Sequence, residues 1–183
     1  RVRTADTPAD LVEGLGASPR YVGRSAYDYL VEFESEQIVR DLRPDLGRLA
    51  KVEARGIIAT GPSAGGDDFV SRFFAPASGI DEDPVTGSAH CCLGPFWSQR
   101  LGRTALTARQ ISPRGGVVRV RVDGERVRLE GQAVTVMSGD LTIRLATEAD
   151  LGVLRELMML SIDRGQAAVL TPEQIVASRA VMG

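Results

Sequence analysis

The stretch Asp83-Pro-Val-Thr-Gly-Ser-Ala-His90 opens a long helical pattern directly after a turn. Thr86 and Ser88 are N-cap residue types, and Gly87 allows a ligand to approach the backbone closely. The first N–H groups of a helix have no internal partners and lie at its positive end, so this helix start is suited to hold a carboxylate. Asp83 can then act as an acid or base, or orient a polar substrate group. A capped helix after a turn, with no ligand, is the alternative interpretation.

These eight residues follow Ser71-Arg-Phe-Phe-Ala-Pro76, and together the two segments resemble the second half of phenazine-biosynthesis-like (PhzF) isomerases. The resemblance covers roughly Tyr27 to Leu141. It implies an α+β protein that forms half of a diaminopimelate-epimerase-like fold, with a mixed or antiparallel sheet wrapped round a central helix. The active site of such enzymes lies in the cleft between two similar halves. The resemblance also implies a cofactor-independent enzyme that moves a proton on a small carboxylic acid.

The same resemblance assigns roles to the residues of the motif. Asp83 is the candidate catalytic residue, and Thr86, Gly87 and Ser88 are candidates for binding the substrate carboxylate. His90, the only histidine of the chain, is added as a candidate substrate-binding residue, and a structural or cleft-lining role is favoured over a catalytic one. One histidine with no nearby carboxylate or thiolate cluster is a poor metal site, so no metal is expected.

The principal acid/base glutamate of that family comes from the first half. None of Glu13, Glu53 and Glu82 stands in the sequence context of that glutamate. Proton abstraction needs a base within hydrogen-bond reach of the substrate. Residues 1–140 are therefore interpreted as a PhzF-like C-terminal half that is inactive alone. Its expected partners are a small carboxylate substrate and the missing N-terminal half or another subunit, with a homodimer possible.

The composition changes at Ser138-Gly-Asp140, and Leu141-Thr-Ile-Arg-Leu-Ala-Thr-Glu-Ala-Asp150 predicts a short strand that runs into a helix. Thr147 is the expected N-cap and Asp150 the acid at the third helical position. This run resembles the β-α start of GNAT-type acetyltransferases. Their glycine-bearing pyrophosphate loop does not appear before Gly183. Residues 141–183 are therefore interpreted as an incomplete GNAT-like segment, and acetyl-CoA is expected only if a complete domain follows.

Composition narrows the class of protein further. With 43% hydrophobic and 25% charged residues over 183 positions, the chain is typical of a globular protein. A net charge of -2 gives no electrostatic reason to expect nucleic-acid or membrane binding. No apolar run approaches the roughly 18–20 residues that span a bilayer, and the first residues do not resemble a signal peptide. A cytoplasmic protein is predicted, and the initial Arg1 suggests a piece of a longer chain.

Local patterns predict the elements around the motif. A short helix is expected after Thr7 as N-cap, a second short helix up to Val52, and a long helix from Ser88 to Leu101 that Pro95 bends. Asp123-Gly124 predicts a type I′ hairpin turn whose flanking arginines form a solvated face. The predicted strands are residues 27–34, 55–60, 69–74, 105–111, 117–122, 125–129 and 133–137.

Two side chains near the motif, Arg72 and Cys91, have two interpretations each. Arg72 can pair with an acid in the cleft or form an ordinary ion pair. Cys92 is expected to be buried, and Cys91 is favoured as a small structural residue over an acid or base. For the whole chain, two other functions stay open: a non-catalytic carboxylate-binding or interaction module, and an acetyltransferase as the main activity of the parent protein.

Overall fold

The computed structural model describes residues 2–132, 147–154 and 156, which fall into two separate units. The second unit contributes the short 3-10 helix η2 (Glu148–Asp150), followed by one helical turn, 151–154. Both the N–H and the hydroxyl of Thr147 donate to the Asp150 carboxylate at 2.8 Å, which confirms the predicted cap. The rest of the segment that was predicted to be GNAT-like, and the strand predicted at 133–137, lie outside the described residues.

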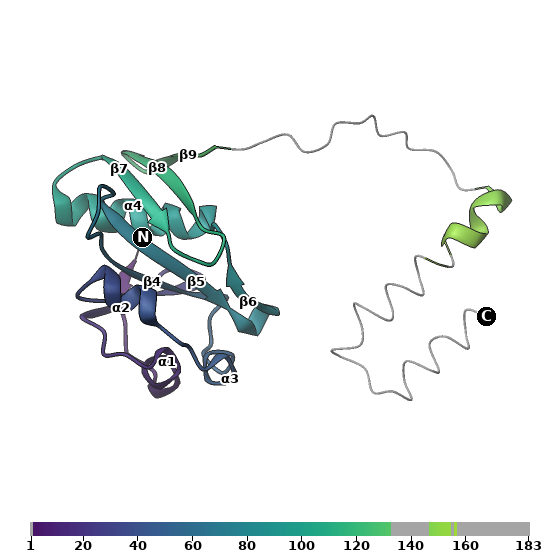
Figure 1. Ribbon diagram of the computed structural model, residues 1–183, viewed down its shortest axis with the longest axis horizontal. Helices are drawn as coiled ribbons and strands as arrows, with labels where there is room; N and C mark the ends of the chain where they lie inside the picture. The colour runs from purple at the N-terminus through teal and green to yellow at the C-terminus, as the bar shows by residue number, and fades with distance from the viewer. Residues whose placement is uncertain (1, 133–146, 155, 157–183) are drawn as a thin grey trace. The chain divides into compact units, whose positions relative to one another are not determined.

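The first unit is built on one mixed sheet, shown in Figure 1. Strands β3 and β4 run parallel, as do β5 and β7, and the other neighbours are antiparallel, which confirms the predicted α+β class. Along the sheet the order is β1-β2-β3-β4-β5-β7-β8-β9, and β6 pairs with β5 beside that path. The strands are β1 (Arg3–Thr4), β2 (Tyr21–Arg24), β3 (Asp28–Glu32), β4 (Gly56–Pro62), β5 (Phe69–Ala75), β6 (Ile80–Asp83), β7 (Ala105–Gln110), β8 (Gly116–Asp123) and β9 (Arg126–Glu130).

Helices pack on both faces of the sheet because the middle strands carry apolar residues at nearly every position. Adjacent residues such as Leu30 and Val31, or Phe73 and Phe74, belong to two different core clusters. One cluster packs against α1 (Ala9–Leu15), α2 (Glu36–Asp41) and α3 (Leu46–Leu49), and the other against α4 (Gly87–Leu101). Strands buried on both sides read as continuous hydrophobic runs rather than alternating ones.

Helix α4 is fixed on its face of the sheet by aromatic packing and close backbone approach. Trp97 stacks on Phe69 with ring centroids 5.5 Å apart, and its Nε1 donates to Thr60 Oγ1 at 2.9 Å. Gly94 leaves so little space that an added Cβ would lie 2.7 Å from a methyl group of Val120. The helix runs through Pro95 and ends at Gly102, whose φ of 65° is the left-handed conformation that favours glycine.

Several local predictions need correction. Thr7 does not cap α1, because Pro8 occupies the N-cap position and the helix begins at Ala9. Helix α3 ends at Leu49, three residues before Val52. The β8–β9 turn is not type I′: Gly124 has φ of 57°, and among the described residues no residue other than glycine has a positive φ, which are the signs of a type II′ turn.

The sequence-based prediction missed the strands β1, β2 and β6, the helix α2 and the short 3-10 helix η1 (Pro76–Ser78). Helix α2 begins after Ser35, whose hydroxyl accepts from the Ile38 N–H. Cys92 is half-buried rather than fully buried, and Cys91 is exposed. The solvated arginine face of the β8–β9 hairpin is confirmed, since Arg119, Arg121, Arg126 and Arg128 are all exposed.

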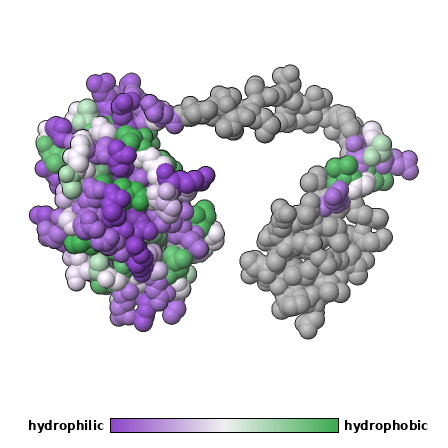
Figure 2. Space-filling model, viewed as in Figure 1, coloured by the Kyte–Doolittle hydropathy of each residue, from purple (hydrophilic) through white to green (hydrophobic). Residues whose placement is uncertain are grey.

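The surface of the first unit is mixed. Figure 2 shows mostly hydrophilic residues on the visible face, with hydrophobic ones scattered between them. Tyr27, Ile80 and Val85 are the most exposed large hydrophobic side chains described in this unit. None of the helices in the described ranges combines the length and the apolar character needed to cross a membrane.

Candidate functional site

The candidate site begins where β6 ends and α4 starts. Asp83 is the last residue of β6, and its carboxylate accepts a hydrogen bond from the Thr86 hydroxyl at 2.5 Å. Thr86 occupies the N-cap position predicted for it, but its hydroxyl turns back to Asp83, and no described side chain caps α4. Gly87 and Ser88, the first helical residues, are exposed. The uncapped N–H groups at this helix start can therefore donate hydrogen bonds to an external acceptor such as a carboxylate.

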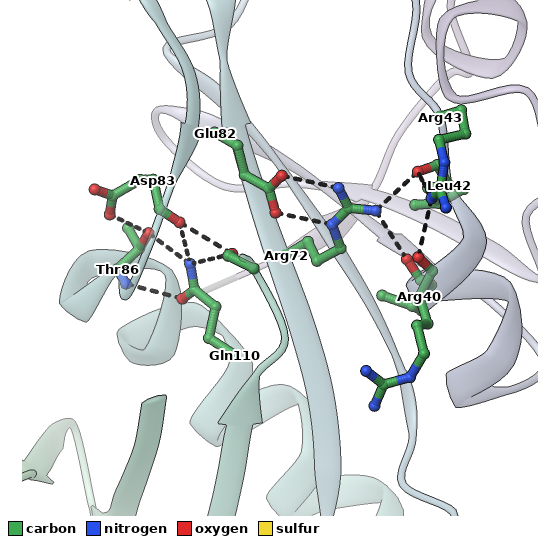
Figure 3. A network of polar contacts seen from close by, with 10 residues as sticks. Arg40, Leu42, Arg43, Arg72, Glu82, Asp83, Thr86 and Gln110 are labelled. Atoms are coloured by element: carbon green, nitrogen blue, oxygen red, sulfur yellow. Dashed lines mark hydrogen bonds and ion pairs between the residues drawn. The ribbon is translucent and has the colours of Figure 1, made fainter. Parts of the chain in front are cut away.

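A buried amide fixes the backbone of this turn (Figure 3). Gln110, at the end of β7, is 1% exposed. Its Oε1 accepts from the Thr86 N–H at 2.8 Å, and its Nε2 donates to the Asp83 carbonyl oxygen at 2.6 Å. Ser112 also donates to that carbonyl oxygen, at 3.2 Å. Because both the aspartate and the threonine are held by one rigid side chain, Asp83 and the start of α4 keep a fixed relative position.

An ion pair holds β6 from its other side. Arg72 on β5 donates through Nε and Nη2 to the two carboxylate oxygens of Glu82, each at 2.8 Å. Its Nη1 donates to the Leu42 carbonyl oxygen at 2.9 Å, near the end of α2, as Figure 3 shows. Glu82 precedes Asp83, so this pair anchors the strand that presents it. Both carboxylate oxygens of Glu82 are therefore engaged by Arg72.

His90 lies under the turn and is fully buried. Its Nδ1 lies 2.7 Å from the Thr86 carbonyl oxygen, and since a carbonyl can only accept, Nδ1 carries the hydrogen. Burial lowers the pKa of His90, which keeps the ring neutral. Among the described residues, its Nε2 has no hydrogen-bond partner. The structure therefore places the His90 ring beneath the turn, away from solvent, and its part in substrate binding stays a prediction.

A second ion pair, which sequence reasoning missed, reaches the motif from β3. Asp28 is 1% exposed, and its carboxylate accepts from Arg55 Nε at 2.9 Å and Nη2 at 2.5 Å. The Asp28 carboxylate raises the pKa of Arg55. Arg55 Nη2 also donates to Ser88 Oγ at 3.2 Å. Residues 28, 55 and 88 are distant in sequence, so only the fold brings them together.

Metal binding and thiol chemistry find less support in the described residues. No group of three or more His, Cys, Asp or Glu side chains in the described parts of the chain is arranged to hold a metal ion. Burial raises the pKa of the Cys92 thiol, which disfavours the reactive thiolate.

Comparisons with known proteins show the family to which the chain belongs. The family model for phenazine biosynthesis-like proteins (PhzC-PhzF) matches residues 10–139, so the chain belongs to this family. An uncharacterized isomerase of Halalkalibacterium halodurans is 48% identical over 137 residues, which are 74% of this chain and 52% of that protein. An uncharacterized isomerase of Pseudomonas aeruginosa is 52% identical over 134 residues, 73% of this chain and 51% of that protein.

Solved structures show the same relationship. The crystal structure of a PhzF-family phenazine biosynthesis protein of Enterococcus faecalis superposes with a TM-score of 0.66 at 33% identity, covering 72% of this chain and 52% of that chain. The chain thus spans about half the length of the relatives it matches.

Proposed function

We propose that this chain is the C-terminal half of a PhzF-like isomerase that transfers a proton on a small carboxylic acid without a cofactor. The observation that carries the proposal is the fixed arrangement of Asp83 beside the exposed, uncapped start of α4. A carboxylate next to a helix N-terminus can place an acid or base within reach of a bound carboxylic acid.

Each residue of the motif has a role in this proposal. Asp83 assists proton transfer or orients the substrate, and the hydrogen bond from the Thr86 hydroxyl holds its carboxylate in place. Gly87 and Ser88 hold the substrate carboxylate through backbone N–H groups and the Ser88 hydroxyl. Thr86 and His90 support this surface from below.

The other half of the active site is proposed to come from an N-terminal half or another subunit. The support is the coverage of about half of each relative, together with the engagement of Glu82 by Arg72. The residues after 140 are proposed to be the start of an acetyltransferase-like segment. The Thr147–Asp150 cap agrees with that reading, and its activity would need acetyl-CoA and a complete domain.

Deuterium exchange tests the proposal. The parent protein, purified from its native cell and checked by intact mass, is incubated with small carboxylic acids in D2O, and incorporation at the carbon next to the carboxylate is followed by NMR. Asp83→Asn is expected to slow the exchange by about 10²–10⁴-fold, the scale of general acid–base catalysis. Asp81→Asn is the matched control, because Asp81 is an exposed carboxylate on the same strand.

Two results would count against this function. Exchange that survives Asp83→Asn at the wild-type rate would remove Asp83 from the reaction. Carboxylate binding with no exchange, in a protein whose mass includes the missing half, would favour the non-catalytic binding module.

A further inference from the structure

Arg55 is held in one orientation before any ligand arrives. Two of its nitrogens contact the two carboxylate oxygens of Asp28, which is the fork geometry that a guanidinium forms with a carboxylate. Asp28 is 1% exposed, so Arg55 cannot turn away from it without leaving the Asp28 carboxylate as a buried, unpaired charge. The ring of Tyr27 lies 5.3 Å from Arg55 Cζ and restricts the guanidinium further.

The contact between Arg55 and Ser88 determines whether the serine hydroxyl donates or accepts in this hydrogen bond. A guanidinium has N–H donors and no acceptor, so in this 3.2 Å contact Ser88 Oγ must be the acceptor. The hydroxyl hydrogen of Ser88 is not used by Arg55 and can be donated elsewhere. Ser88 is exposed in the first turn of α4, and the Arg55 guanidinium lies beside its hydroxyl.

We propose that the Asp28–Arg55 pair is a positioning device that makes Ser88 a hydrogen-bond donor and thereby selects an anionic acceptor, a carboxylate oxygen, over a neutral or donating group. This inference rests on the proposed function, because Ser88 belongs to the proposed carboxylate site. It adds to that function the residues that make the site prefer an anionic ligand. The guanidinium is the exposed end of the Asp28–Arg55 ion pair, so the positive end of this pair lies beside the hydroxyl and favours an anion. A hydroxyl that already accepts a charged hydrogen bond is also a stronger donor.

The test uses the full 183-residue chain and two probes of nearly equal shape, benzoate and benzamide. Binding is measured by NMR from the amide resonances of Gly87 and Ser88. Benzoate is expected to shift both resonances and to bind about tenfold more tightly than benzamide, the scale of one charge-assisted hydrogen bond. Arg55→Met is expected to remove this preference.

The controls separate positioning from general damage. Arg109→Met removes an arginine of similar exposure whose ion pair, with Asp67 at 2.6 Å, does not contact the motif, and benzoate affinity should not change. Should Arg55→Met unfold, Arg55→Lys gives the comparison, because lysine keeps the charge beside Asp28 but loses the fork. In a Ser88→Ala background, Arg55→Met should change benzoate affinity by about twofold or less, because the pair acts through Ser88.

The possible outcomes separate the positioning role of Arg55 from the proposed function on which it rests. A benzoate response in the wild-type chain that Arg55→Met leaves unchanged, or additive effects of Arg55→Met and Ser88→Ala, would overturn the positioning role alone. No benzoate response at Gly87 and Ser88 in the wild-type chain would overturn both the carboxylate site and this inference.

Discussion

The Gln110 side chain satisfies a backbone donor and a backbone acceptor of the Asp83 turn at once. Gln110→Ala would leave the buried Thr86 N–H without its partner, while the Asp83 carbonyl oxygen would keep the hydrogen bond from Ser112. Since one unpartnered buried group costs about 1–3 kcal/mol, we expect the free energy of unfolding to fall by that amount in urea titrations. Gln99→Ala on the exposed side of α4 is the control and should be near neutral. A Gln110→Ala protein as stable as the Gln99→Ala protein would show that the clamp contributes nothing.

His90 gives the stability a pH dependence of known sign. Its pKa in the folded protein is lowered below the ordinary 6.5 by burial, so below pH 6.5 the unfolded chain binds a proton that the folded chain does not. The stabilisation is therefore complete above pH 6.5 and is lost as the pH falls, by at most about 1.4 kcal/mol per pH unit. His90→Asn keeps a donor for the Thr86 carbonyl but does not titrate. Its stability between about pH 5 and 7.5 should fall less steeply than that of the wild type, and equal slopes would contradict the prediction.

At the scale of elements, α4 approaches the β8–β9 hairpin closely at Gly94. A Cβ at Gly94 would lie 2.7 Å from Val120 Cγ1 and 3.3 Å from Val127 Cγ1. We expect Gly94→Ala to destabilise the protein by about 1–3 kcal/mol, although alanine is the better helix former. Gly66→Ala, with nothing within 4 Å, is the matched control. A shift of the thermal midpoint no larger than that of Gly66→Ala would mean that α4 can move away from the hairpin.

The elements that sequence reasoning placed correctly are those with a strong local signal. The β7–β9 strands alternate with period two, and the α4 boundary follows from its cap residues and Gly102. Strand β6 has no such signal, because its residues are mostly exposed and it is a strand only through its pairing with β5. Helix α2 is six residues long, too short for a periodic pattern to stand out.

The candidate site also contains residues that the sequence predicts and residues that only the fold brings together. The motif from Asp83 to Ser88 is contiguous in sequence, so it could be predicted from local residue types. Its supports could not be, since Gln110 and Arg55 reach it from other strands, and no spacing in the sequence encodes such a contact. The one available signal for Gln110 was a polar residue in the inward-facing series after Leu106 and Ala108.

At the scale of the molecule, the first unit has two cores that share one sheet. Trp97, the only tryptophan, reports on the α4 side, whereas Leu11 lies fully buried on the other. We expect Leu11→Ala to shift the Trp97 fluorescence transition to lower urea concentration, at a cost of about 2–5 kcal/mol, because the middle strands couple the two cores. Leu101→Ala, at a residue 39% exposed, should shift it far less. A Trp97 transition that Leu11→Ala leaves in place would mean that the two faces unfold independently.

The apolar residues on both faces of the middle strands raise a question of strand register. In most sheets a slip by one residue turns apolar side chains to water, but here it would only exchange one core for the other. The buried polar groups prevent this exchange. Asp28, Glu32 and Thr60 all point to the α4 side, where they meet Arg55, Arg100 and Trp97 respectively. A slipped strand would turn both carboxylates towards a face that offers neither arginine, and an unpaired buried charge costs about 3–5 kcal/mol. The Asp28–Arg55 and Glu32–Arg100 ion pairs thus also fix the register in which the strands pair.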